Sequence, residues 1–405
     1  MRNKEINEKI NEKINEKINT VRRSGKLVLY PNKAQRKQLR LTIEACRTAW
    51  NWCLEYHKDY YEKENKYAMA GQMRKAFTDE RKREDSEINW INKVSSTAVN
   101  NVPNLLVIAF KNFFRKQGGY PNKKFLFSDS KSFYVNPQTL KLVNGKINIE
   151  RCGKIKAKQI AGPDISSCKV YSPMCKINGD KFILTFSYEK IKRDLPVKFY
   201  YDLPLGIDVG VNKLATLSNG KSYKNINFDP KIKELKNKIN RLIEIKRNKR
   251  KVRRKLGIKE KSKNEYKIEN KIKKLFLKIR YITDNYNHCV SKDIVYNENP
   301  DKIVTETLLI KSLIEQNSKD KSTKHLATYI KDAKINQFLR FIEYKCEDKA
   351  IKLLKAPVNF ESSKTCSSCG EVNDKIKLSD RTYECKGCGL KIDRDLNAAK
   401  NLSYL

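Results

Sequence analysis

Four cysteines in the sequence have the spacing of a metal site. They form the pairs Cys366-x2-Cys369 and Cys385-x2-Cys388, with fifteen residues between the pairs. This spacing is typical of four-cysteine zinc sites, and the glycines beside the pairs let the backbone turn its amides toward the thiolates. Because four thiolates complete the tetrahedral shell of Zn²⁺, we expect one structural zinc and reject zinc as a catalytic metal.

Two acidic residues lie in apolar segments that have the pattern of strands. In "LPLGIDVG", alternation places the apolar residues on one face and Asp208 on the other, and Gly206 and Gly210 leave space around its carboxylate. In "DKIVTETLLI", Glu306 lies at the C-terminal end of an apolar run, where a sheet normally presents functional groups. A lone acid in either strand is more often an edge or turn residue. If the two strands are parallel neighbours, however, their carboxylates come together.

A third acid lies at a predicted helix start, in the segment "DRDLNAAKNL" that follows the second cysteine pair. Three clustered carboxylates repel one another and need cations, and hard oxygen ligands favour Mg²⁺ or Mn²⁺ over zinc. Two such ions stabilise the attacking and leaving oxygens of an in-line phosphodiester displacement. The acids therefore predict metal-dependent hydrolysis at phosphorus.

The composition predicts a polyanionic partner. The 405 residues include 87 Lys and Arg against 46 Asp and Glu, a formal charge of +41 at pH 7. Neutralised phosphates release counterions, so nucleic acid is favoured over an anionic membrane surface. There is no apolar run long enough for a transmembrane helix or a signal peptide, and we expect a soluble, cytoplasmic, nucleoid-associated protein. Seven cysteines outside the two pairs have the scatter of buried thiols in a reducing compartment: Cys46, Cys53, Cys152, Cys168, Cys175, Cys289 and Cys346.

The first half of the sequence predicts a leader and a β-rich domain. Residues 1–24 form a basic, low-complexity leader, either a short helix or a tail without structure. Residues 25–202 contain a strand at "GKLVLYPN", a helical insertion at about 33–118 that Asn32 can cap, and later strands from "SFYVNP" to "DKFILTFSYEK". Basic and aromatic residues alternate there, which suits phosphate contact and base stacking.

Residues 203–405 predict an α/β layer domain. Three closely spaced strands are followed by a basic helical hairpin at about 230–297, a strand, a helix and a further strand. A zinc ribbon at about 362–390 and a last helix complete the domain. Few acids balance the Lys and Arg of the hairpin, which favours a rod that faces nucleic acid over a merely solvated surface.

At these residues the chain resembles the transposon-associated TnpB proteins and their relatives, the compact type V CRISPR effectors. "GIDVGVNKLATLSNG" resembles the first RuvC motif and aligns Asp208 with its metal-binding Asp, and "IVTETLLIKSL" resembles the second and aligns Glu306 with its Glu. The third motif has its Asp two residues before the Asn of "NAA", which points to Asp395 and leaves Asp393 as the helix cap. Thr307 is a departure, since the family more often has an acidic or small residue there. "SSKTCSSCG" and "YECKGCG" look like the zinc ribbon, and "CRTAWNWCLEY" and "GGYPNKKF" extend the resemblance toward the N-terminus.

The resemblance implies a fold and an activity. The fold is an RNase H-like (RuvC) nuclease domain with an inserted zinc ribbon and a basic helical hairpin, preceded by a β-barrel-like wedge domain with a helical recognition insertion. The activity is RNA-guided DNA endonuclease, in which a guide RNA pairs with one strand of a double-stranded DNA target. Asp208, Glu306 and Asp395 would hold two Mg²⁺ or Mn²⁺ ions and carry catalysis, and the four paired cysteines would hold one Zn²⁺.

Two other functions share these features. One is a guide-RNA-directed DNA-binding repressor that does not cut, against which the three acids argue, and the other is a transposase that joins strands. The short chain favours the transposon-associated type over the CRISPR effector. The sequence leaves open the guide RNA, the target-adjacent motif, and whether one copy or two bind each RNA.

Overall fold

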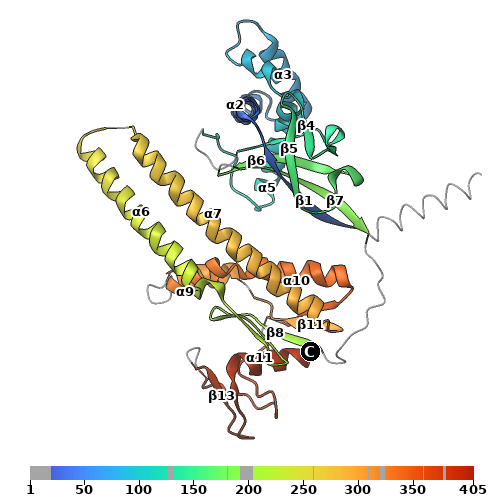
Figure 1. Cartoon of the computed structure of the whole chain (residues 1–405), viewed down its shortest axis with the longest axis vertical. Helices are drawn as coiled ribbons and strands as arrows, with labels where there is room; N and C mark the ends of the chain where they lie inside the picture. The colour runs from blue at the N-terminus through green and yellow to red at the C-terminus, as the bar shows by residue number, and fades with distance from the viewer. Residues whose placement is uncertain are drawn as a thin grey trace, which may run out of the picture. The chain divides into compact units, whose positions relative to one another are not determined.

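The chain divides into two compact units, Met1–Ile191 and Lys192–Leu405, which are described separately (Figure 1). The structure is a computed structural model that describes residues 20–125, 131–179, 181–191, 204–258, 260–308, 310–319, 324–358, 360–376 and 380–405. The repeat at residues 4–19 of the predicted leader lies outside these ranges. Over the described residues there is no helix long and apolar enough to cross a membrane.

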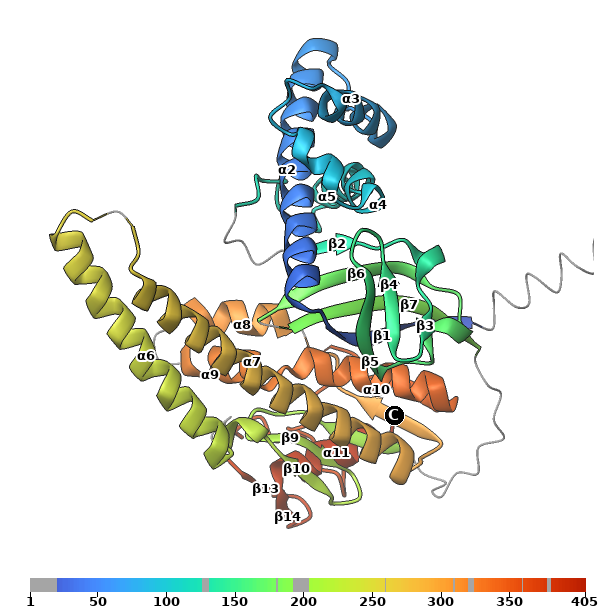
Figure 2. The same ribbon diagram turned by 45° about the horizontal axis from the view of Figure 1, so that its top comes forward.

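One antiparallel sheet forms the frame of the first unit. Its order is β2-β6-β7-β1-β5-β4-β3, counted over the described residues (Figure 2). The central strand β1 pairs with β7 along most of its length and with β5 on its other side. The strands are β1 (Thr20–Tyr30), β2 (Ser132–Tyr134), β3 (Leu142–Val143), β4 (Lys146–Ile149), β5 (Gly153–Ala161), β6 (Tyr171–Asn178) and β7 (Lys181–Ile191).

The predicted strands of this unit are present, with three differences. β1 begins at Thr20, before the predicted start at Gly25, because it continues along β7. β5 was not predicted, since lysine at every second position of "GKIKAKQ" leaves only Ile155 and Ala157 as its buried apolar residues. The barrel-like closure is wrong for the described residues, where β2 and β3 are open edges. Alternation predicts strands but not which edges meet, which depends on sheet twist.

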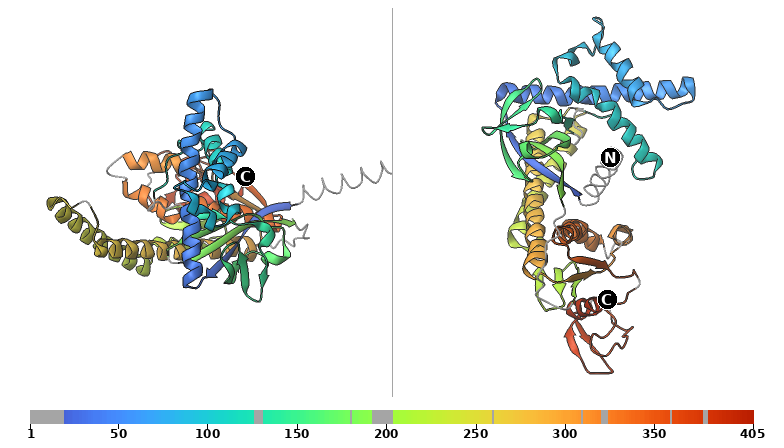
Figure 3. Two further views of the ribbon diagram at one scale, coloured as in Figure 1. Left: turned by 90° about the horizontal axis from the view of Figure 1, so that it is seen from above. Right: turned by 90° about the vertical axis from the view of Figure 1, so that its right-hand side faces the viewer.

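The helical insertion lies between β1 and β2 and consists of α2 (Lys33–Glu64), α3 (Ala70–Lys82), α4 (Ser96–Asn100) and α5 (Val102–Phe114). Asn32 caps α2, as predicted, and a capping box with Gln35 satisfies the first backbone amides. The long helix α2 extends past the sheet, and α3, α4 and α5 pack along it (Figure 3). Its buried face joins the core of the sheet and of the other three helices through Leu39, Ala49 and Cys53.

The sheet of the second unit mixes parallel and antiparallel strands. Its strands are β8 (Leu205–Asp208), β9 (Lys213–Leu217), β10 (Ser222–Lys224), β11 (Lys302–Thr305) and β12 (Lys352–Lys355). The order is β10-β9-β8-β11-β12 among the described residues, and β11 pairs in parallel with both β8 and β12. The strands of Asp208 and Glu306 are therefore parallel neighbours, which is the condition under which the two carboxylates come together.

Helices cover both faces of this sheet. The helices of the described part of this unit are α6 (Pro230–Lys255), α7 (Lys263–Lys292), α8 (Ile310–Lys319), α9 (Lys324–Ala333), α10 (Ile335–Lys349) and α11 (Arg394–Ser403), with a π-helical turn η5 (Asp293–Asn297) after α7. α6 and α7 form a helical hairpin (Figure 2). One face of the sheet packs on α7, η5 and α10 through residues such as Ile207, Ile294 and Phe338. On the other face, α11 packs along β8.

A small ribbon lies between β12 and α11. Its strands β13 (Thr382–Glu384) and β14 (Lys391–Asp393) pair in an antiparallel manner, and its core contains Cys366, Tyr383 and Cys385. β14 ends at Asp393, and α11 begins at the next residue. The ribbon therefore leads directly into the helix that carries Asp395.

Candidate active site and zinc centre

Alternation along β8 decides which face of the sheet carries Asp208. Leu205 and Ile207 belong to the core beneath α7 and α10, so Gly206 and Asp208 point to the opposite face. There the backbone of α11 lies so close that a Cβ on Gly206 would be 1.9 Å from the carbonyl oxygen of Ala399. Gly206 thus makes room for the helix, and the expectation that it clears space around the carboxylate is wrong.

The three predicted acids come from three elements that meet on this face. Thr305 pairs with Ile207, so the next residue on each strand places Glu306 beside Asp208. Asp395 lies in the first turn of α11, which packs on β8 and also contacts β9 and β11. The structure therefore brings together acids that are far apart in the sequence.

Asp393 has the separate role that was predicted for it. Its carboxylate accepts a hydrogen bond from the backbone N–H of Leu396, at 3.1 Å, and caps α11. It also pairs with Lys213, with 2.9 Å between Oδ2 and Nζ. Burial opposes ionisation of Asp393, but the bonds from Lys213 and Leu396 outweigh it and lower the pKa of this carboxyl. Asp393 is therefore an ionised helix cap whose negative charge is paired with the positive charge of Lys213.

The charges of the acids act on one another. Burial, followed by the charges of Glu306 and Asp395, raises the pKa of Asp208 well above its usual range, and Arg394 only partly opposes this. Within the described ranges, the carboxylates are not as close together as the ribbon sulfurs, all of which lie within 4.8 Å of one another. The cluster is thus a group of partly buried carboxylates whose mutual repulsion a cation would relieve.

A polar network beside the acids was not predicted from the sequence. The hydroxyl of Ser362 donates to Oε1 of Glu306. Asn401 of α11 donates to the carbonyl oxygens of Ser362 and Thr365, at 2.7 and 2.6 Å. Asn397, the Asn of the "NAA" segment, donates to the same Thr365 oxygen at 2.7 Å. Two asparagines four residues apart on a buried helix face are a sequence signal for such a network, whereas a single serine gives none.

Thr307, the departure from the family pattern, points away from the acids. Its hydroxyl donates to the carbonyl oxygen of Ala356, which follows β12. The backbone of Ala356 in turn donates to the carbonyl oxygen of Thr305, at 2.8 Å. Thr307 therefore fastens the end of β11 to the neighbouring strand.

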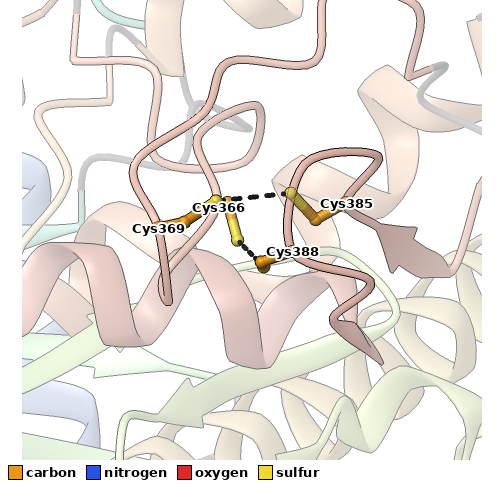
Figure 4. Close-up of side chains that lie close together, drawn as sticks. All are labelled: Cys366, Cys369, Cys385 and Cys388. Atoms are coloured by element: carbon orange, nitrogen blue, oxygen red, sulfur yellow. Dashed lines mark hydrogen bonds between the residues drawn. The ribbon is translucent and has the colours of Figure 1, made fainter.

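The four cysteines of the ribbon face one another from two loops (Figure 4). The Sγ atoms of Cys366 and Cys388 are 3.6 Å apart, and those of Cys369 and Cys385 are 3.5 Å apart. Burial opposes ionisation of Cys366, but backbone N–H groups of Cys369 and Ser368 outweigh it and lower the pKa of the thiol to about 7. Backbone N–H groups favour ionisation of Cys369 and Cys385, but burial and the neighbouring thiols outweigh them and raise the pKa values of both thiols. It is therefore the convergence of the four sulfurs that fits a tetrahedral zinc ion.

Two family models match parts of the chain. Residues 336–402 match the family described as "Cas12f1-like, TNB domain", which spans α10, the ribbon and Asp395. Residues 21–66 match the "Helix-turn-helix domain" of OrfB from IS605. In this structure the second range holds the strand β1 and the single helix α2, so the description of that model does not match the local structure.

Full-length relatives extend these matches. The chain is 26% identical, over 94% of its length and 89% of the relative, to a Streptomyces pristinaespiralis protein that carries the name of RNA-guided DNA endonuclease. It is 26% identical, over 93% of its length and 90% of the relative, to InsQ of Escherichia coli, which carries the same name. The fold is similar to the protein in a Cas12f1-sgRNA-target DNA complex, with a TM-score of 0.57, 14% identity, and 95% and 99% of the two chains covered. The family models, the relatives and the shared fold agree: the chain is similar to the TnpB-like proteins over nearly its whole length.

Proposed function

We propose that this protein is an RNA-guided DNA endonuclease of the TnpB type that hydrolyses phosphodiester bonds at a single RuvC-like site. The observation that carries the proposal is the meeting of Asp208, Glu306 and Asp395 on one face of the sheet, at the ends of two parallel strands and the start of α11. Two relatives that cover nearly the whole chain carry the name of this activity.

The three acids fit divalent metal ions. Their oxygens are the hard ligands that Mg²⁺ and Mn²⁺ prefer, and a bound cation would oppose both the burial and the neighbouring charges that raise the pKa of Asp208. Two such ions, when bound, would stabilise the attacking and leaving oxygens of the displacement. Asp208, Glu306 and Asp395 would be the protein ligands, while Asp393 is occupied by Lys213 and by the start of α11.

Gly206, the ribbon cysteines and the sheet core would support the site without taking part in the reaction. Gly206 seats α11 on β8, which sets Asp395 relative to Asp208. The ribbon cysteines would hold one structural zinc with no position left for substrate. The sheet core beneath Ile207 and Ile303 keeps the two strand ends rigid. Precise placement of this kind is what metal-assisted displacement requires.

The rest of the molecule would bind nucleic acid. A formal charge of +41 would gather a guide RNA and double-stranded DNA in the cytoplasm, where the nucleoid is the source of the target. The β-rich unit and its helical insertion would hold the RNA and recognise a short motif beside the target, and base pairing would supply sequence specificity. The exposed basic face of the α6 and α7 hairpin would add phosphate contacts.

The test is cleavage by the purified protein with its co-purified RNA in Mg²⁺. Sequencing that RNA gives the guide sequence, from which a matching DNA target is chosen. The same sequence also tells a transposon-end RNA from a repeat-derived guide. We expect Asp208→Ala to reduce the cleavage rate at least about a thousandfold while RNA binding is retained, because the missing carboxylate cannot be replaced by water as a charged ligand. Undiminished cutting by this variant would refute the proposed site, and strand-transfer products would identify a transposase.

A further inference from the structure

We propose that Ser362 is a positioning residue for Glu306, and that through it the zinc ribbon sets the affinity of the acid cluster for its divalent cation. This inference rests on the proposed function, because it assigns Glu306 to a metal-binding cluster. Nothing in the spacing of the cysteines or acids predicts it. It follows from a chain of hydrogen bonds between the ribbon, α11 and Glu306.

The first link is the contact between Ser362 and Glu306. Ser362 is 2% exposed, and its hydroxyl donates to Oε1 of Glu306, which directly follows β11. A glutamate side chain has several rotatable bonds, so a free one loses rotamer freedom when it binds a cation. A buried donor on one oxygen holds the carboxylate in a single orientation and leaves Oε2 for a ligand. Partners of this kind orient metal ligands in many proteins.

The second link holds Ser362 itself in place. We call residues 362–367 the strap. Asn401 donates to the carbonyl oxygens of Ser362 and Thr365, and Asn397 accepts from the backbone N–H of Ser367, at 2.9 Å, while donating to Thr365. Both asparagines are buried on α11, at 0% and 5% exposure. The strap is therefore fixed to the helix that carries Asp395.

The third link joins the strap to the zinc site. Cys366 is part of the strap and is buried at 2% exposure, so a zinc bound there would hold the strap from the ribbon side. At its other end the ribbon continues from β14 into Asp393, the cap of α11. The ribbon is thus joined to Glu306 at its entry and to Asp395 at its exit. A bound zinc would order both connections.

The experiment measures Mn²⁺ binding by the full chain with its RNA, using the electron paramagnetic resonance signal of free Mn²⁺. The Mn²⁺ bound by the acid cluster is the difference between the Mn²⁺ bound by a given chain and the Mn²⁺ bound by the Asp208→Ala variant. We expect Ser362→Ala to weaken this binding by about 10–100-fold, the usual effect of removing a partner of a metal ligand. The zinc content should stay at one per chain. Cleavage should require correspondingly more Mg²⁺ and recover in part when Mg²⁺ is saturating.

Two matched variants serve as controls. Ser363→Ala removes the neighbouring hydroxyl, for which the described part of the chain offers no partner, and should bind Mn²⁺ like the unchanged protein. Ser362→Thr keeps a hydroxyl and should restore most of the affinity. Unchanged Mn²⁺ binding by Ser362→Ala, or loss of zinc together with Mn²⁺, would overturn the proposal, because the second result would mean that Ser362 only supports the ribbon. If Asp208→Ala binds as much Mn²⁺ as the unchanged protein, the proposed active site itself fails.

The route through the ribbon has its own test. Cys388→Ser, at an exposed zinc ligand, should release zinc and weaken Mn²⁺ binding. Because both changes act through the strap, Cys388→Ser should have little further effect in a chain that already carries Ser362→Ala. Full additivity of the two changes would contradict the coupling, since independent sites add.

Discussion

Gly206 shows how one residue without a side chain can decide the geometry of an active site. A Cβ at this position would lie 1.9 Å from the carbonyl oxygen and 3.0 Å from the carbonyl carbon of Ala399, both in the backbone of α11. Backbone cannot rotate out of the way as a flexible side chain can. The helix that carries Asp395 must therefore move if Gly206 is changed.

We predict that Gly206→Ala displaces α11, destabilises the protein by at least about 1–3 kcal/mol, and lowers cleavage more than it lowers RNA binding. Thermal unfolding and single-turnover cleavage would check this. Gly71→Ala is the matched control, because Gly71 lies in α3 with open space around its Cβ position. Ala is the better helix former, so this control should gain about 0.5–1 kcal/mol. Equal behaviour of the two variants would contradict the packing argument.

At the residue scale, the sequence predicted the cysteines and acids that could bind metal better than it predicted the residues that surround them. The cysteine pairs and the strand acids could be named because residue type and spacing carry information in themselves. The metal-binding role of Asp208, Glu306 and Asp395 stays a prediction. The function of Gly206 was misassigned, and Ser362 was not found, because both depend on a helix that packs from elsewhere in the chain.

At the scale of elements, a histidine of α2 stacks on one aromatic ring of α5 and on another in the segment that follows α2. His57 is 5% exposed and stacks on Phe110, with ring centroids 4.3 Å apart, and on Tyr67 at 5.9 Å. Burial lowers the pKa of His57 below its usual value, and a hydrogen bond with the backbone of Ala68 offsets only part of this. The folded chain therefore keeps His57 neutral at a pH where the unfolded chain is already protonated.

The sign of the pH effect follows from this difference. Above the ordinary histidine pKa of about 6.5, His57 is neutral in both the folded and the unfolded chain and does not affect the free energy of unfolding. Below that pH the unfolded chain binds a proton that the folded chain does not, so the free energy of unfolding falls. We predict that the free energy of unfolding of the unit Met1–Ile191 falls as the pH is lowered from about 6.5 to the pKa of folded His57. The loss should be at most about 1.4 kcal/mol for each pH unit. Thermal unfolding of the full chain at pH 7.5 and 5.5 would measure it.

His57→Phe, which preserves the aromatic stack, should flatten this pH dependence. The exposed His288 of α7 provides the control, since His288→Gln should leave the dependence in place. If His57→Phe and the unchanged chain lose equal stability on acidification, carboxylates elsewhere cause the effect and the assignment to His57 is wrong.

Elements were predictable where their patterns were regular. Asn32 and Asp393 were identified as helix caps from residue type and position, and both accept the expected backbone amides. The parallel pairing of β8 and β11 was only a condition at the level of sequence, because two apolar strands with a long connection between them do not have to be neighbours. β5 escaped notice because lysines occupy its exposed face and only small stretches of it are buried. The open edges of the first sheet could not be predicted, because they depend on contacts between strands remote in sequence.

At the scale of the whole molecule, charge decides the strength of nucleic-acid binding. The far half of α6 exposes Arg247, Arg250, Lys251 and Arg254. The tip of the hairpin is kept ordered by the capping box of Ser262 with Glu265 and by the ion pair of Glu265 with Arg253. These four cations are therefore presented by a stable rod.

We predict that changing the four exposed cations to Gln weakens RNA binding and lowers the slope of log affinity against log salt by about 3. Each contact to a single-stranded phosphate contributes about 0.7 to that slope. Binding titrations from 50 to 300 mM salt would measure it. The matched variant, with Lys at the three Arg positions, keeps the charge and should keep the slope. A slope that the Gln variant leaves unchanged would show that the hairpin does not contact phosphate.

The parallel pairing of β8 with β11 also has a consequence for the order in which the chain acquires its properties. The whole helical hairpin and η5 lie between these strands in the sequence, and the ribbon lies between β12 and α11. Contacts of such long range form late, after local helices and hairpins. We therefore expect a newly made chain to hold RNA on its helices before its three acids meet. Until β8 and β11 pair, the strand ends that carry Asp208 and Glu306 do not lie beside each other, so the capacity to cut depends on the part of the fold with the longest connection.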